Sequence, residues 1–258
     1  KKNGVEDVVE DGKSLLHLAV LNNMPSLVET LLQRGANINA LDRFRYTPLH
    51  MALNKRNINK TIVNILLTAQ QPVDMMVQND FLTTPLMYLC KNKDIGQYLD
   101  ILYKLVPKEL KNAHLYINVM NKNGENALQL VCANSLNIKA IEYLIDMGAN
   151  VNNVSHRDEF PLLYALRAKK QDIVLLLMKK GADIDMSFKG KSVIEIARDQ
   201  GMPDIIDTFI KQQYDTNFFT SNEILAIENT FESPPAQVEL WTDLVVSSRI
   251  LMADTEAM

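Results

Sequence analysis

The chain has 258 residues, of which 47% are hydrophobic and 22% charged, a composition that suits a continuous core and excludes the disordered class. The formal net charge of −4 argues against a dedicated nucleic-acid binder, which normally carries a basic face. No apolar run approaches the roughly 20 residues that cross a bilayer, and we find no secretory signal pattern. The first residue is Lys1 rather than methionine, so we expect a piece of a longer protein.

A short motif that opens a helix recurs six times along the chain, and its first residue is Ser, Thr or Asn in five of the six cases. The first residues of these openings are Ser14, Thr47, Thr84, Asn126, Phe160 and Ser192, spaced 32 to 42 residues apart. Units this short cannot bury a core alone and must stack on one another. The spacing therefore predicts a repeat architecture.

The first unit, residues 11–40, contains the predicted elements of one repeat. Ser14 is placed to cap a helix whose apolar face includes Leu18. Pro25 fits the first turn of a second helix, and Gly35 fits the position just after its end. Each unit is thus predicted to be a helix–turn–helix.

Two cysteines are too few for a disulfide scaffold and fit a reducing compartment. Cys90 and Cys132 each lie six residues after the opening of their own unit, so we expect equivalent buried positions in adjacent repeats. Stacked helices lie about 8–10 Å apart. A disulfide needs Cα atoms within about 7 Å, so both cysteines are predicted to be free core thiols.

Thr47-Pro48-Leu49-His50 opens the second unit, and Gly35-Ala36-Asn37-Ile38-Asn39 and Gly148-Ala149-Asn150-Val151-Asn152 close two others. These motifs and the period resemble the ankyrin repeat over about residues 11–212. The resemblance implies an all-α ankyrin-repeat solenoid of stacked helix–turn–helix units with hairpin-like fingers, whose concave side usually binds another protein. It also implies that His17 and His50, which share one register, hydrogen-bond finger backbone between neighbouring repeats.

Residues 1–212 are assigned to this domain, with repeats near 9–41, 42–78, 79–120, 121–154, 155–186 and 187–213. Residues 213–258 lack the period and are predicted to form a C-terminal helical extension. Thr220 to Glu223 fits a capping box, and Trp241 lies on the apolar face of a second helix. These helices are expected to cap the stack of a monomer. The alternatives are an arm that packs on another domain and a dimer formed through Trp241.

Several repeats depart from the family pattern. The finger glycine is kept as Gly12, Gly124 and Gly190 and is replaced in the other units by Arg45, Leu82 and Asp158. The third unit carries an insertion at about residues 107–118. Such an insertion is a surface loop or short extra helix on the binding or edge face, or else drift in a tolerant loop.

Patterns that suggest chemistry are explained by the repeats. Gly12-Lys13-Ser14 and Gly190-Lys191-Ser192 resemble the end of a phosphate-binding loop but lack its earlier glycine. The histidines do not have the spacing of a zinc motif, and we find no nucleophile elbow or paired acid and base. The sequence predicts a non-catalytic fragment without metal or cofactor.

The finger tips and the exposed side of the first helices are not needed to hold a stack. Aromatic residues and arginines at turn tips depart from the usual Asn, Asp, Gly and Ser and match the composition of interface hot spots. The predicted partner-binding residues are Arg43, Phe44, Tyr46, Lys55, Asp80, Phe81, Lys91, Lys122, Glu125, His156, Arg157, Phe188 and Lys189. Phe44 and Phe81 share a register and are expected to be neighbours. The alternatives are phenylalanines that pack back on a finger and lysines that form a solvated face.

The first functional hypothesis is a cytoplasmic protein–protein interaction scaffold that docks an acidic or mixed-polarity segment through finger tips and concave helix face. The second is a substrate-targeting arm of a larger multidomain enzyme or host-directed effector, because the Asn- and Ile-rich composition also resembles ankyrin proteins of intracellular bacteria or viruses. An effector would act in the host cytosol. The third is self-assembly through the C-terminal helices.

Overall fold

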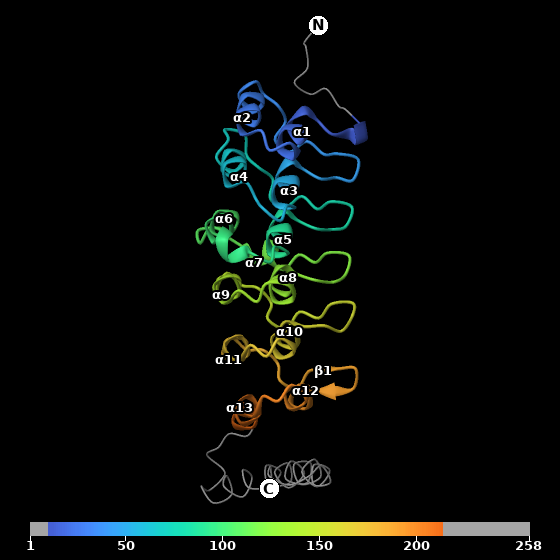
Figure 1. The fold of residues 1–258 in the computed structure, drawn as a ribbon, viewed down its shortest axis with the longest axis vertical. Coiled ribbons are helices and arrows are strands. Elements are labelled where there is room, and N and C mark those ends of the chain that lie inside the picture. The colour runs from blue at the N-terminus through green and yellow to red at the C-terminus, as the bar shows by residue number, and fades with distance from the viewer. Residues whose placement is uncertain (1–9, 214–258) are drawn as a thin grey trace, which may run out of the picture. The chain divides into compact units, whose positions relative to one another are not determined.

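The computed structural model describes residues 10–213. The chain divides into two compact units, residues 1–207 and 208–258, and the second is described only over residues 208–213. The first unit is a stack of helix pairs with a row of hairpin-like loops along one side (Figure 1). The predicted solenoid of stacked helix–turn–helix units with hairpin-like fingers is therefore confirmed.

Each pair has an inner helix beside the loops and an outer helix behind it (Figure 1). The inner helices are α1 (Leu15–Leu21), α3 (Pro48–Leu53), α5 (Pro85–Cys90), α8 (Ala127–Asn134), α10 (Pro161–Arg167) and α12 (Val193–Asp199). The outer helices are α2 (Pro25–Gln33), α4 (Lys60–Leu67), α6 (Leu99–Leu105), α9 (Ile138–Asp146) and α11 (Gln171–Lys179). The chain continues into α13 (Pro203–Gln213), which spans the boundary between the two units. The shorter elements are 3-10 turns η1 (Glu10–Gly12) and η2 (Ile95–Tyr98), helix α7 (Ala113–Ile117) and strands β1 (Ser187–Phe188) and β2 (Lys191–Ser192).

Side-chain caps explain where most inner helices begin. The first residue of the opening accepts a hydrogen bond from the backbone N–H three residues later, in a capping box. The residues that do so are Ser14, Thr47, Thr84, Asn126 and Ser192. Ser14 and Ser192 belong to the two Gly-Lys-Ser triplets, so the repeat accounts for these triplets. Phe160 makes no side-chain cap and instead lies buried ahead of α10.

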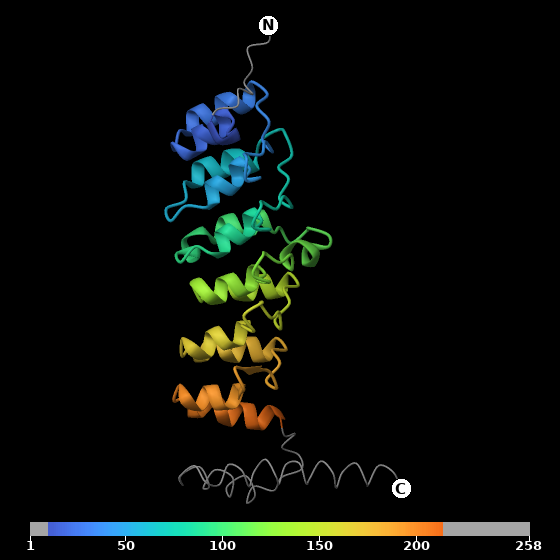
Figure 2. The ribbon, with the colours of Figure 1, turned by 90° about the vertical axis from the view of Figure 1, so that its right-hand side faces the viewer.

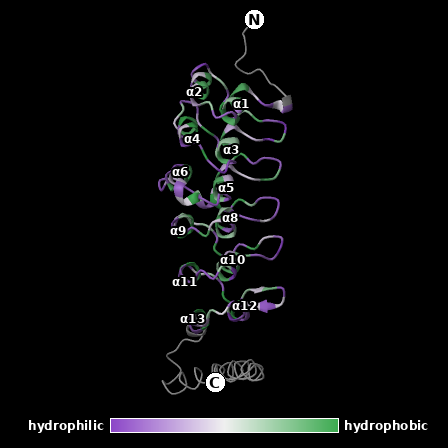
Figure 3. Cartoon of the chain, in the orientation of Figure 1, coloured by the Kyte–Doolittle hydropathy of each residue, from purple (hydrophilic) through white to green (hydrophobic). Residues whose placement is uncertain are grey.

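The core lies between the layers of the stack. Each inner helix contacts the next inner helix, and the outer helices α2, α4, α6, α9 and α11 follow one another in the same way. Leu49, Leu86, Leu128 and Leu162 occupy one register of the inner helices and are almost completely buried. Burying one such side chain is worth about 1.5–3 kcal/mol. Figure 3 shows the hydrophobic residues on the helices and the hydrophilic residues along the loops.

Cys90 and Cys132 are buried and free, as the sequence predicted. Burial raises the pKa of both thiols well above the ordinary value, so neither carries the thiolate that nucleophilic or metal chemistry requires. Both residues act as small apolar side chains in adjacent inner helices, α5 and α8.

The insertion in the third repeat forms helix α7, which lies beside α6 and away from the row of loops (Figures 1 and 2). Asn112, which precedes it, has a positive φ of 61°. Ala113, Tyr116 and Ile117 of α7 are buried, whereas Leu115 is exposed. The insertion is thus a short extra helix on an edge of the stack.

The predicted C-terminal helices, with the capping box near residue 220 and Trp241, lie outside the described residues. Their proposed capping and dimer roles stay predictions. Over residues 10–213, every helix is too short or too polar to cross a bilayer.

Candidate partner-binding surface

The loop before each inner helix is called a finger. Fingers two to six are residues 42–46, 79–83, 121–125, 155–159 and 187–191, and finger one is residues 11–13. In fingers two to five, a side-chain oxygen of the first residue accepts hydrogen bonds from two later backbone N–H groups of the same finger. These first residues are Asp42, Asn79, Asn121 and Ser155. Each of these fingers therefore supports its own turn.

The fourth residue of each of fingers two to six has a positive φ, whether or not it is glycine. Arg45, Leu82 and Asp158 have φ of 63°, 54° and 59°, and Gly124 and Gly190 have 75° and 76°. The left-handed conformation costs a residue with a side chain about 1–2 kcal/mol. The departures seen in the sequence therefore keep the backbone of the finger and add strain.

Backbone hydrogen bonds join finger to finger from one to five. Each is donated by an N–H of one finger to a carbonyl of the preceding finger. The four bonds run from Arg43 N to Asp11 O, Asp80 N to Phe44 O, Lys122 N to Phe81 O and His156 N to Asn123 O, at 2.8–3.1 Å. The fingers that carry Phe44 and Phe81 are thus adjacent, and the neighbouring placement of the two side chains stays a prediction.

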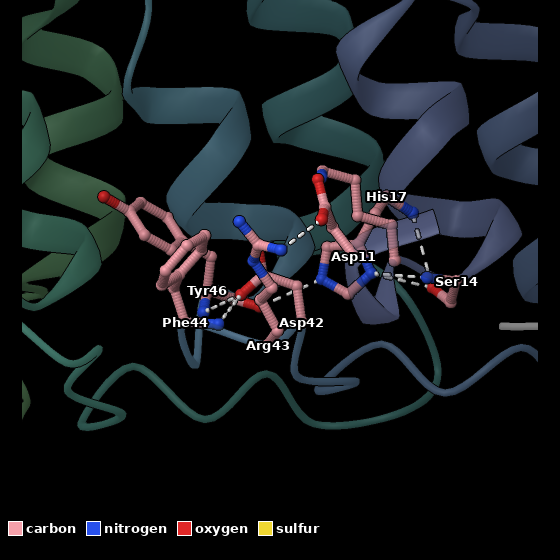
Figure 4. Close-up of polar contacts among 8 residues, drawn as sticks. Asp11, Ser14, His17, Asp42, Arg43, Phe44 and Tyr46 are labelled. Atoms are coloured by element: carbon pink, nitrogen blue, oxygen red, sulfur yellow. Dashed lines mark hydrogen bonds and ion pairs between the residues drawn. The ribbon is translucent and has the colours of Figure 1, made fainter. Parts of the chain in front are cut away.

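His17 and His50 link their helices to the next finger, as the family resemblance implied. Nδ1 of His17 accepts the backbone N–H of Ser14, so Nε2 carries the proton and donates to the carbonyl of Tyr46 at 3.0 Å (Figure 4). His50 does the same with the N–H of Thr47 and the carbonyl of Thr83, the latter also at 3.0 Å. Burial lowers the pKa of both rings, that of His50 to about 4. Both histidines are therefore neutral structural residues at pH 7.

Gln129 takes the same role in the fourth repeat, which the sequence prediction missed. Its Nε2 donates to the carbonyl of Glu159 at 2.7 Å. The signal was available, because Gln129 lies in the register of His17 and His50 and also carries an amide donor.

Fingers two and three carry exposed aromatic residues among the predicted site residues. Phe44 and Phe81 are 41% and 53% exposed. The guanidinium of Arg43 lies 4.4 Å from the ring centre of Phe44 and forms an ion pair with Asp11 at 2.6 Å (Figure 4). Asp80 is exposed beside Phe81. These side chains form a surface that the stack does not use.

Two predicted site residues have structural partners. Lys55 Nζ donates to the carbonyls of Val20 and Leu21 at the end of α1, at 2.8 and 3.1 Å. Tyr46 is half-buried, and its hydroxyl accepts a hydrogen bond from the Tyr88 hydroxyl at 2.7 Å. Lys55 and Tyr46 therefore contribute to the contacts between repeats.

Lys91 and Glu125 lie near one another at the third and fourth repeats. Lys91 Nζ is 5.4 Å from the ring centre of Tyr88. Partial burial lowers the pKa of Lys91, and the charge of Glu125 opposes this shift. Glu125 also accepts hydrogen bonds from the side chains of Asn121 and Asn123.

Among the remaining predicted residues, Lys122, His156, Arg157 and Lys189 are exposed on fingers four to six. Phe188 is not exposed, because Arg167 and Lys189 lie over its ring with 4.4 and 5.2 Å between charge and ring centre. Phe188 is thus covered by a side chain of α10 and one of its own finger, and not by the adjacent finger as the alternative had it.

The finger tips carry more positive than negative charge, although the whole chain is acidic. The exposed charged residues of fingers two to six that form no ion pair with an inner helix are Arg43, Arg45, Asp80, Lys122, Arg157, Asp158 and Lys189.

Over residues 10–213, no group of three or more His, Cys, Asp or Glu side chains is placed to hold a metal ion.

Comparisons with known proteins agree with this architecture. The family described as "Ankyrin repeats (3 copies)" matches residues 16–114 and 96–187. Rabankyrin-5 of Mus musculus is 28% identical over 182 residues, which are 70% of this chain but only 14% of that protein. The chain therefore spans a small part of this relative.

Two solved structures show the same fold. An ankyrin repeat domain from Acinetobacter baumannii AYE superposes with a TM-score of 0.61 at 26% identity, over 74% of this chain and 93% of that one. The ankyrin repeat domain of Bcl-3 superposes with a TM-score of 0.58 at 22% identity, over 83% and 92%. This fold is generally a non-catalytic interaction module. The chain belongs to the ankyrin repeat family and is a protein–protein interaction domain.

Proposed function

We propose that this domain is a scaffold that holds an acidic or mixed-polarity segment of a partner protein against its finger tips and inner-helix face. The observation that supports the proposal is the exposure of Phe44 and Phe81 on fingers whose backbone bonds are already satisfied. Exposed aromatic side chains at turn tips do nothing for the stack, and a partner that buries them gains apolar contact.

Rigid side chains continue this surface along the inner helices. The Tyr164 hydroxyl donates to Glu159 at 2.9 Å, and Arg167 pairs with the same carboxylate at 3.0 Å while it lies over Phe188. A side chain that is held in place before binding loses little conformational entropy when a partner arrives. The excess of cations at the finger tips favours acidic residues in that partner.

A reducing compartment such as the cytoplasm suits this scaffold, because its two cysteines lie free in the core. The second hypothesis, a targeting arm of a larger enzyme or effector, stays a prediction from the sequence.

The test is affinity capture of partner proteins with the intact chain and with the double variant Phe44→Ala/Phe81→Ala. Tyr46 is left unchanged because it bonds to Tyr88. Loss of two hot-spot side chains is expected to weaken capture of the same partner by about tenfold or more. The midpoint of thermal unfolding should stay almost unchanged, since both side chains are exposed.

The matched control is Leu27→Ala/Leu175→Ala, which removes two similarly exposed apolar side chains from the outer helices α2 and α11. This variant should capture the partner as well as the intact chain does. Equal capture by the finger variant, or a loss that only the outer-helix variant shows, would contradict the proposal.

A further inference from the structure

The hydrogen bonds that join successive fingers stop before finger six. In the register of the other fingers, Phe188 N would donate to Arg157 O, and no hydrogen bond joins these atoms. The side-chain link is missing as well, because Leu163 occupies the register of His17, His50 and Gln129 and has no donor. Of the described fingers, finger six alone lacks both links to the preceding finger.

Finger six is instead a separate β-hairpin. β1 and β2 pair Phe188 with Lys191 and Ser187 with Ser192, and the two-residue turn between them has φ of 52° at Lys189 and 76° at Gly190. Two positive φ values are typical of the type I′ hairpin turn. In finger two, by contrast, Asp42 N donates to Tyr46 O four residues later. The strand pairing of finger six is therefore shifted in register by one residue relative to that of finger two.

This register leaves one edge of β1 free. Val193 N donates to Met186 O beyond the Ser187–Ser192 pair. Hydrogen-bonded and non-bonded pairs alternate along antiparallel strands, so the Ser187–Ser192 pair is a non-bonded one. The backbone N–H and C=O of Ser187 then point away from β2. An unpaired strand edge is a template for another extended chain.

A groove lies between fingers five and six, where the links are missing. It has a volume of about 430 Å³ and is lined by Val154, Asp158, Phe160, Met186, Ser187, Lys189 and Gly190. Val154 is 43% exposed, so the groove presents an apolar surface next to the free backbone of Ser187. Backbone groups for pairing and apolar contact for alternate side chains are what strand addition requires.

The charges at these two finger tips favour an acidic occupant. Among residues 156–158 and 188–191, Asp158 is the single acidic residue, against Arg157, Lys189 and Lys191. Lys191 forms an ion pair with Asp199. Within the described part of the chain, Arg157 and Lys189 form no ion pair, although Lys189 lies over the ring of Phe188.

We propose that this groove binds an extended acidic segment of a partner protein, which adds as a strand to β1. The segment pairs its backbone with Ser187, turns one set of alternate side chains toward Val154 and Met186, and places acidic side chains near Arg157 and Lys189. This inference rests on the proposed function, because it gives one site and one chemistry to the partner of the finger row.

The test uses the full chain and a synthetic peptide in which glutamate and valine alternate. Two comparison peptides replace glutamate with lysine or carry N-methyl groups on the amides of one edge. Binding of the glutamate peptide should slow hydrogen exchange of the Ser187 amide in NMR spectra. The lysine peptide and the N-methylated peptide should each bind more weakly than the glutamate peptide by about tenfold or more. Equal binding of the N-methylated peptide would overturn strand addition, and equal binding of the lysine peptide would overturn the acidic occupant.

Val154→Asp places a negative charge in the groove and should weaken binding of the glutamate peptide by about tenfold. Leu41→Asp is the matched control, because Leu41 has the same register in finger two and is 41% exposed. This control should bind normally. Peptide binding that survives Val154→Asp, or a dimer of the chain in which β1 pairs with a second copy, would overturn the inference. Partner capture that still depends on Phe44 and Phe81 would then leave the proposed function standing.

Discussion

At the scale of single residues, the histidine register shows how one side chain joins two repeats. His50 receives a backbone N–H at Nδ1 and donates from Nε2 to the next finger, and it is fully buried. Gln129 makes the same connection to the next finger without an ionisable group. Where this link to the next finger forms, it thus requires a donor rather than a charge.

The buried histidine makes stability depend on pH. The pKa of His50 is about 4 in the folded chain against an ordinary 6.5, so between these values the unfolded chain binds a proton that the folded chain excludes. The free energy of unfolding should therefore fall by about 3 kcal/mol as pH drops from about 7.5 to 4, with little effect of this group above that range. Urea unfolding at several pH values measures this.

His50→Gln supplies the comparison, because glutamine keeps the donor. The variant should lose this part of the pH dependence and stay folded at pH 7. A variant with the same decline between pH 6.5 and 4 as the parent would show that His50 is not responsible.

At the scale of elements, the finger turn is defined by its backbone conformation more than by its residues. Leu82 holds a φ of 54° at the position where three of the other fingers have glycine. In the left-handed region a Cβ atom raises the conformational free energy by about 1–2 kcal/mol. In a helix, by contrast, glycine is less stable than alanine by about 1 kcal/mol.

Leu82→Gly should accordingly be more stable than Leu82→Ala by about 1 kcal/mol, because only the glycine relieves the strain. The same pair of changes at Leu175, an exposed residue of α11, should give the opposite order. Free energies of unfolding from denaturant titration decide between the two orders. Alanine ahead of glycine at position 82 would contradict the account of the finger turn.

The helix starts and the finger turns could be predicted from the sequence because the signals for them are local. Ser14 and Thr47 cap helices where the pattern placed them, and Arg45 keeps the conformation of the glycine it replaces. The burial of Phe188 under Arg167 and the engagement of Lys55 with α1 depend on contacts between repeats. A sequence pattern that treats each repeat by itself cannot predict these contacts between repeats.

The missing link before finger six is also a relation between repeats. Leu163 removes the side-chain donor of the histidine register, but Met87 stands in the same register and finger four keeps its backbone bond to finger three, so this position alone does not predict the missing link. The change in hairpin pairing that accompanies it, and the groove beside β1, follow only from the three-dimensional arrangement.

At the scale of the whole molecule, the described stack separates stability from recognition. Leucines and the histidine register hold the repeats together inside the stack, while exposed aromatic and cationic side chains lie along the fingers. The chain is acidic overall, so the basic finger tips differ in sign from the protein as a whole. Such a contrast orients an acidic partner toward one side of the domain.

The most direct test of this separation is photo-cross-linking from defined positions. Benzoylphenylalanine in place of Phe44 or Phe81 should form a covalent adduct with one partner protein on irradiation, because these side chains lie on the binding surface. The same photo-cross-linker in place of Leu175, on an outer helix, should form none. Adducts from position 175 together with none from positions 44 and 81 would contradict the account.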